Sequence, residues 1–172
     1  MIDTMEGEII NRVANSSIIN FDLEEYYDKN ERVLFDIKDN LFNGFVLKEK
    51  DFRAFVKEND WDKYQDKNVA IICSVDAIVP TWAYMLLVSA IEPFAKNVIF
   101  GSLDKLEQFL FQKALAQIDL KTFEGEKIII KGCGRYPVPE FAYVEITRLL
   151  NPVAKSIMYG EACSAVPVFK AK

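Results

Sequence analysis

The chain has 172 residues, of which 51% are hydrophobic and 13% aromatic, a composition that excludes a disordered tail and suits one domain with a substantial core. Its 21 basic and 26 acidic residues give a net charge of −5, and no run of Lys and Arg gathers on one periodic face, so no nucleic acid partner is expected. The chain has no histidine, which excludes Ser–His and Cys–His nucleophilic pairs and every zinc site that needs imidazole.

The cellular location is predicted from the absence of targeting patterns. The acidic start of the chain lacks the basic and apolar regions of a signal peptide. The longest apolar run, residues 77–91, contains Pro80 and is shorter than a membrane span requires. We therefore expect a cytoplasmic protein with no membrane partner, in which three cysteines do not form a disulfide framework.

The first 50 residues predict a short helix followed by two or three strands, at residues 9–13, 19–23, 33–37 and 45–47. Hydrophobic and polar residues alternate in the strand segments, as they do in half-buried strands. The connections between them are too short for a crossover helix, so we expect these strands to pair antiparallel at one edge of the sheet.

The rest of the chain contains an internal repeat. Asp51–Gly101 and Leu110–Gly160 align without a gap at an offset of 59. The identical pairs include Val79/Val138, Pro80/Pro139, Ala83/Ala142, Tyr84/Tyr143, Pro93/Pro152, Ala95/Ala154, Lys96/Lys155 and Gly101/Gly160. Each copy predicts a helix, a strand, a loop with Val-Pro, a second helix and a strand that ends in Gly. The predicted helices cover residues 52–56, 80–91, 103–118 and 139–150, and the predicted strands cover residues 69–72, 97–100, 128–130 and 157–159.

Strand–helix–strand units with short loops favour a mostly parallel sheet flanked by helices, in the α/β class. The predicted architecture is a single domain over residues 1–172, with an N-terminal α+β segment (1–50), two repeats (51–101 and 110–160) and a C-terminal tail (161–172). The helix over residues 82–91 is apolar nearly all round, so we expect the N-terminal segment or a second subunit to cover it, which makes a homodimer a candidate assembly.

The three cysteines all follow predicted strand ends. Cys73 closes the strand over 69–72, Cys133 follows the strand over 128–130, and Cys163 lies beyond Gly160. Ligands bind beyond the carboxyl ends of strands in open α/β sheets, and Cys73 and Cys133 each precede a Val-Pro helix start, whose dipole favours thiolate. The pattern therefore predicts a site built from thiolates.

Several chemistries fit such a site. Three thiolates could hold zinc, with Asp76, Glu161 or water as the fourth ligand, or an iron–sulfur cluster. Two of them could form a redox pair, although no Cys-x-x-Cys motif supports this, and free cysteine is also a common core residue. Arg135 and Lys131, together with Lys155 and Lys96, could receive an anion, although such residues are more often solvated loop charges.

The motifs resemble a known bacterial family. The stretches that carry the resemblance are Val33–Phe52, Ala77–Leu87, Lys131–Arg148 and Ala154–Pro167, and it covers essentially the whole chain. The family is an uncharacterised domain of unknown function found mainly in Bacteroidetes, and it brings no established activity, cofactor or catalytic residue. Its genes often lie near the sulfur-mobilisation machinery, so the resemblance implies iron–sulfur assembly proteins as candidate partners.

Three functional hypotheses follow from the sequence. The first is a metal- or iron–sulfur-associated protein that uses Cys73, Cys133 and Cys163. The second is a thiol-dependent redox protein or enzyme in which Cys133, beside Arg135, supplies the thiolate. The third is a non-catalytic homodimeric adaptor that uses the apolar helix over residues 82–91.

Overall fold

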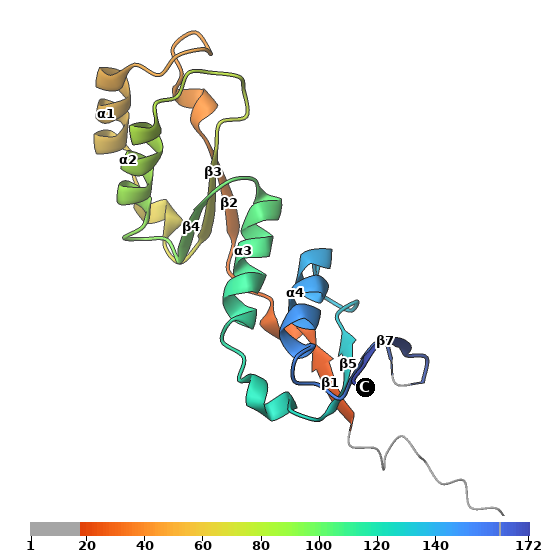
Figure 1. The fold of residues 1–172 in the computed structure, drawn as a ribbon. Coiled ribbons are helices and arrows are strands. Elements are labelled where there is room, and N and C mark those ends of the chain that lie inside the picture. The colour runs from red at the N-terminus through yellow and green to blue at the C-terminus, as the bar shows by residue number, and fades with distance from the viewer. Residues whose placement is uncertain (1–17, 162) are drawn as a thin grey trace, which may run out of the picture. The chain divides into compact units, whose positions relative to one another are not determined.

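The computed structural model describes residues 18–161 and 163–172, which form two compact units. Unit 1 contains residues 18–27 together with the described residues from 114 onward, and unit 2 contains residues 28–113. Parallel strands flanked by helices occur in both units, so the predicted α/β class is confirmed (Figure 1). The predicted helix over 9–13 lies outside the described residues, and the organisation as a single domain stays a prediction.

Unit 2 contains a three-stranded parallel sheet in the order β2-β3-β4. Its strands are β2 (Arg32–Asp36), β3 (Asn68–Ile72) and β4 (Asn97–Phe100). Its α-helices are α1 (Glu49–Glu58), α2 (Thr81–Ile91) and α3 (Leu103–Leu115). The last two residues of α3, after Lys113, belong to unit 1. The short 3-10 helices of unit 2 are η2 (Ile37–Asn40) and η3 (Asp62–Tyr64).

The central strand β3 is buried on both faces because helices cover both sides of the sheet. Val69 and Ile71 belong to a core that includes the buried residues of α1 and α2. Ala70 points the other way, as alternate residues of a strand do, and it packs with Leu106 and Leu110 of α3. This double burial explains the continuous apolar run in the sequence of β3.

A row of polar side chains is buried at the start of β3 and β4. Asn97 donates its side-chain amide to Oδ1 of Asn68 at 2.7 Å, and Asn68 donates to Oδ1 of Asp28 at 3.0 Å. Lys113 Nζ donates to Oδ1 of Asn97 at 2.7 Å. Since Asn68 is fully buried, this chain of bonds satisfies polar groups that would otherwise destabilise the core.

Unit 1 contains a four-stranded sheet in the order β1-β5-β6-β7. Strands β1 (Ile18–Asp22), β5 (Lys127–Lys131) and β6 (Ser156–Tyr159) are parallel, and β7 (Val166–Lys170) pairs antiparallel with β6. The helix α4 (Glu140–Leu150) buries Ala142, Ile146 and Leu150, which share one face at helical spacing. The unit also contains the short 3-10 helices η1 (Leu23–Tyr26) and η4 (Leu120–Phe123).

Equivalent elements of the two units have the spacing of the sequence repeat. Strand β5, helix α4 and strand β6 begin at residues 127, 140 and 156, each 59 residues after the starts of β3, α2 and β4 at residues 68, 81 and 97. The origin of this spacing in a duplication stays a prediction.

The predicted antiparallel N-terminal edge is wrong. Strands β1 and β2 do not pair with each other; β1 pairs parallel with β5, and β2 pairs parallel with β3. Each of the apolar central strands needs a parallel neighbour on both sides, and β1 and β2 supply one each. The antiparallel edge is formed instead by β7, in the segment predicted to be a tail, where Pro167 is tolerated because an edge strand needs fewer N–H donors.

The residues around Phe45 and Leu47 do not form a third strand. Val46 makes only isolated bridges, to Phe42 and to Ile78.

None of the described helices is long and apolar enough to cross a bilayer. On α2, Ala83, Leu87 and Ile91 are buried, whereas Met85 remains 66% exposed, and the homodimer stays a prediction.

Candidate functional site: a cysteine–tyrosine pocket

The candidate site lies in unit 1, beyond the carboxyl ends of three parallel strands. Cys133 follows the end of β5 by two residues, and Tyr159 is the last residue of β6. Tyr143 lies in the first turn of α4, the helix that connects these strands. This edge is where parallel α/β sheets place their ligand sites, because the loops and helix N-termini meet there.

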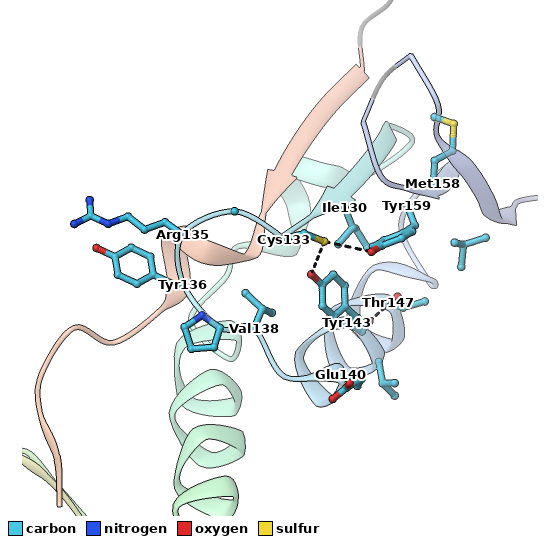
Figure 2. A pocket seen from close by; sticks show the side chains of 15 residues that line it. Ile130, Cys133, Arg135, Tyr136, Val138, Glu140, Tyr143, Thr147, Met158 and Tyr159 are labelled. Atoms are coloured by element: carbon cyan, nitrogen blue, oxygen red, sulfur yellow. Dashed lines mark hydrogen bonds between the residues drawn. The ribbon is translucent and has the colours of Figure 1, made fainter.

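The Cys133 sulfur faces two tyrosine hydroxyls. Its Sγ lies 3.3 Å from Oη of Tyr159 and 3.7 Å from Oη of Tyr143, and Figure 2 shows both contacts converging on the sulfur. The two rings meet edge to face, with centroids 5.7 Å apart and an interplanar angle of 79°. That packing fixes the positions of the hydroxyls relative to each other.

The two hydroxyls stabilise the thiolate form of the cysteine. The hydrogen bond with Tyr159, followed by that with Tyr143, holds the pKa of Cys133 below its ordinary value of 9.0. Burial raises the pKa of Tyr143, and the hydrogen bond with Cys133 raises the pKa of Tyr159. When Cys133 ionises, the tyrosines therefore remain protonated and donate to the sulfur.

Cys133 lies at the wall of an open pocket of about 1060 Å³. Most of its lining side chains are apolar or aromatic, and they come from β5, the loop after it, α4, β6 and β7. The lining residues are Ile130, Gly132, Cys133, Gly134, Arg135, Tyr136, Pro137, Val138, Glu140, Tyr143, Val144, Thr147, Met158, Tyr159 and Val168. Val144 and Val168 are 68% and 53% exposed, so the pocket leaves apolar surface uncovered. Such a cavity suits the apolar part of a small molecule.

Gly132 provides the space in which Tyr143 reaches the sulfur. A Cβ atom at this position would lie 2.8 Å from Oη of Tyr143 and 3.2 Å from Cγ2 of Val138. Real Cβ atoms essentially never approach another atom to 2.8 Å, so any larger residue would displace the hydroxyl. The glycine is required for packing rather than for an unusual backbone conformation.

A smaller and more polar hollow of about 240 Å³ also reaches Cys133, and it is lined in part by Asp22, Glu24, Lys131 and Glu161. Lys131 Nζ lies 3.3 Å from a carboxylate oxygen of Asp22. The hydrogen bond with Asp22 is the main reason that the pKa of Lys131 is raised, and Glu161 and Glu24 add to it. The carboxylates outnumber the single lysine among these four residues, which does not favour an anion.

Arg135, the other residue predicted to bind an anion, points away from the sulfur (Figure 2). Its guanidinium lies over the ring of Tyr136, 5.2 Å from the centroid. The anion site at Arg135 and Lys131, and the contribution of Lys96 and Lys155, stay predictions.

Unit 2 has a similar pair of aromatic rings but lacks the thiol and one of the two hydroxyls. The residues 59 positions before Cys133, Tyr143 and Tyr159 are Ser74, Tyr84 and Phe100. Tyr84 and Phe100 also meet edge to face, with centroids 5.1 Å apart and an angle of 81°. The ring geometry therefore occurs in both units, whereas the thiol and the second hydroxyl are present together only in unit 1.

The predicted three-cysteine site stays a prediction, because its residues are divided between the two units. Cys73 and Asp76 belong to unit 2, whereas Cys133, Cys163 and Glu161 belong to unit 1. Cys133 and Glu161 line the same small hollow, and Cys73 donates its thiol to the carbonyl oxygen of Val75 at 3.4 Å. Over residues 18–161 and 163–172, no three Cys, Asp or Glu side chains come together as metal ligands. The zinc and iron–sulfur hypotheses therefore gain no support.

Sequence reasoning identified Cys133 but missed two of its neighbours. Tyr159 stands where the other copy has Phe100, and this difference between the copies is a signal that could have indicated it. Glu24, which binds the loop after Cys133, carries no such signal because it lies more than 100 residues away and outside the repeat.

Fold and site together define an α/β protein with a pocket at the carboxyl edge of a parallel sheet, where Cys133 faces two tyrosine hydroxyls. The chain belongs to the family described as "Protein of unknown function (DUF2480)", whose model matches residues 7–171. The predicted membership in an uncharacterised family is thus confirmed. No curated protein and no solved structure was found to match the chain.

Proposed function

We propose that the protein acts through the Cys133 thiolate on an apolar, carbonyl-containing molecule that occupies the adjoining pocket. The observation that carries this proposal is the placement of one exposed sulfur between two tyrosine hydroxyls at the wall of an apolar cavity.

A thiolate nucleophile needs stabilisation, access and a bound substrate. The tyrosine hydroxyls supply the stabilisation in a chain without histidine, because they donate hydrogen bonds to the charged sulfur. The exposure of Cys133 supplies the access. The pocket supplies a place for the substrate, and its apolar lining favours an apolar group over a charged one.

The tyrosines also suit the charge movement of a carbonyl addition. A sulfur lone pair forms the new S–C bond, and the π electrons of the carbonyl group move onto its oxygen, which becomes the anion. The hydroxyls of Tyr143 and Tyr159, which donate to sulfur before the attack, can then donate to that oxygen. Solvent supplies the proton that neutralises the adduct, so the step needs no further reactant.

Residue-resolved alkylation tests this proposal. The protein is treated with limiting iodoacetamide or N-cyclohexylmaleimide at pH 7, and the modified peptides of Cys73, Cys133 and Cys163 are measured by mass spectrometry. We expect Cys133 to react about tenfold faster than the other two thiols, with a greater advantage for the apolar maleimide. Equal rates at the three thiols in the folded protein would refute the proposal, and Cys133→Ser identifies the Cys133 signal.

The metal-binding and iron–sulfur hypotheses make a different prediction. They require bound metal or a visible chromophore in protein purified without oxygen, with loss of that metal in variants of the cysteines. Metal analysis of the same preparation therefore separates them from the thiol proposal.

A further inference from the structure

The carboxylate of Glu24 receives three consecutive backbone donors from the loop that carries Cys133. The N–H groups of Gly134, Arg135 and Tyr136 all donate to it, with the Arg135 and Tyr136 nitrogens 2.8 Å and 3.2 Å from Oε2. Successive N–H groups that point at one anion form a strong, charge-assisted arrangement. The bond from Arg135 is the largest reason that the pKa of Glu24 lies below its ordinary value.

Local sequence fixes both sides of this clamp. On one side, Asp22 caps the 3-10 helix η1 and accepts the N–H of Glu24 at 3.0 Å, while the neighbouring Leu23 is fully buried. On the other side, Gly134 lets the carboxylate approach the backbone, because a Cβ atom there would lie 2.8 Å from Oε1 of Glu24. The loop and the helix are therefore shaped for each other.

The corresponding loop of unit 2 has no glutamate at the position of Glu24. Asp36 caps η2 as Asp22 caps η1, by accepting the N–H of Lys38 at 3.1 Å. Lys38 thus stands in the position of Glu24, and its ammonium cannot accept a hydrogen bond. Asp36 itself accepts the N–H of Ser74 at 3.1 Å. The glutamate clamp is present in the unit that carries the cysteine with two hydroxyl donors.

The charge of Glu24 alone works against a thiolate, since it raises the pKa of Cys133. A glutamate beside a reactive cysteine is therefore unfavourable unless its geometric effect outweighs its charge. The clamp can have such a geometric effect because the clamped residues begin directly after the cysteine.

We propose that Glu24 is a positioning residue for Cys133: its carboxylate holds residues 134–136 so that the sulfur faces the hydroxyls of Tyr143 and Tyr159. This inference rests on the proposed function, because positioning matters only if the thiolate reacts. The positioning role and a purely electrostatic role predict opposite effects when the charge is removed.

The test is the pH dependence of Cys133 alkylation by iodoacetamide in Glu24→Gln. If Glu24 positions the loop, the hydrogen bonds to sulfur weaken and the midpoint of the profile moves to higher pH, with a fall in rate at pH 7 of roughly two- to fourfold. If Glu24 acts only as a nearby charge, the midpoint moves to lower pH, and this result overturns the inference. Glu24→Asp keeps the negative charge but shortens the side chain by one methylene group. A positioning role therefore predicts that the alkylation midpoint again moves to higher pH, whereas an electrostatic role predicts almost no change in the midpoint.

A control variant and a second variant of the clamp complete the experiment. Glu25→Gln removes a neighbouring exposed charge and should leave the Cys133 profile unchanged. Gly134→Ala disturbs the clamp from the loop side and should reproduce the effect of Glu24→Gln, which decides the matter if one variant fails to fold. The Cys73 peptide in the same sample reports loss of the fold of unit 2, and thermal unfolding of each variant reports loss of the fold of unit 1. If wild-type Cys133 reacts no faster than Cys73, the proposed function fails; if it reacts faster and the variants do not raise its midpoint, only the positioning role fails.

Discussion

Replacing Tyr159 by Phe should weaken the stabilisation of the Cys133 thiolate without disturbing the fold. The change removes one oxygen, which lies 3.3 Å from the sulfur and is the largest cause of the lowered pKa. The ring itself should pack as before, because unit 2 already has Phe100 in contact with Tyr84 at a similar angle.

The size of the effect follows from the net contribution of one hydrogen bond. Its loss should change the acid dissociation constant of the Cys133 thiol by roughly two- to twelvefold. The alkylation midpoint should move to higher pH by about 0.3 to 1 pH unit, and below the midpoint the thiolate fraction of Cys133 should fall by that factor. A thiolate of higher pKa is intrinsically more nucleophilic, with a Brønsted coefficient of about 0.4–0.5, so the rate below the midpoint should fall only by roughly 1.5- to fourfold. Above the midpoint the order should reverse, and the variant should react faster than the wild type.

The assay is iodoacetamide alkylation of Cys133 across a pH series, with Tyr143→Phe as the matched comparison. The Tyr143 oxygen lies 3.7 Å from the sulfur, so its loss should move the midpoint less than the loss of Tyr159 does. An unchanged or lowered midpoint in Tyr159→Phe would show that the hydroxyl does not stabilise the thiolate, and the reasoning would be refuted.

Two further substitutions test the packing that supports these arguments. Gly132→Ala should displace the Tyr143 hydroxyl and move the Cys133 alkylation midpoint to higher pH, and a profile identical to the wild type would show that the 2.8 Å approach is not needed. Asn68→Ala should lower the free energy of unfolding by about 1–3 kcal/mol in urea titration, because it leaves the buried amide of Asn97 without its acceptor, and a change below about 0.5 kcal/mol would contradict this account.

The elements of the fold could be predicted from local patterns, whereas the strand pairing could not. The buried runs over 69–72 and 128–130 predicted β3 and β5 closely, because a strand covered on both faces needs an uninterrupted apolar run. The alternation at residues 19–23 and 33–37 predicted β1 and β2, but not their partners. A short connection permits antiparallel pairing without requiring it, and here each strand pairs instead with a central strand far along the chain.

The candidate site was predictable to the extent that it depends on position relative to strand ends. Cys133 could be singled out because it follows an apolar run and precedes a helix with Pro at its start. The side chains around the Cys133 sulfur and its loop depend on what converges in space, and neither the contact with Tyr159 nor the clamp by Glu24 has a signature in spacing. The three-cysteine site stays a prediction for the same reason, since equivalent positions in two copies do not establish that the cysteines meet.

The candidate site depends on the pairing of β1 with β5, which joins segments more than 100 residues apart. In that register Asp22 lies opposite Lys131, so the end of β1 and the start of the cysteine loop lie side by side. Glu24 reaches the loop only because η1 begins directly after this pair. A slip of one residue would turn every side chain of β1 to the other face and carry the carboxylate away from its three donors. The buried Phe21 and Leu23 oppose such a slip, so the hydrophobic pattern that anchors β1 also places Glu24 beside the loop that follows Cys133.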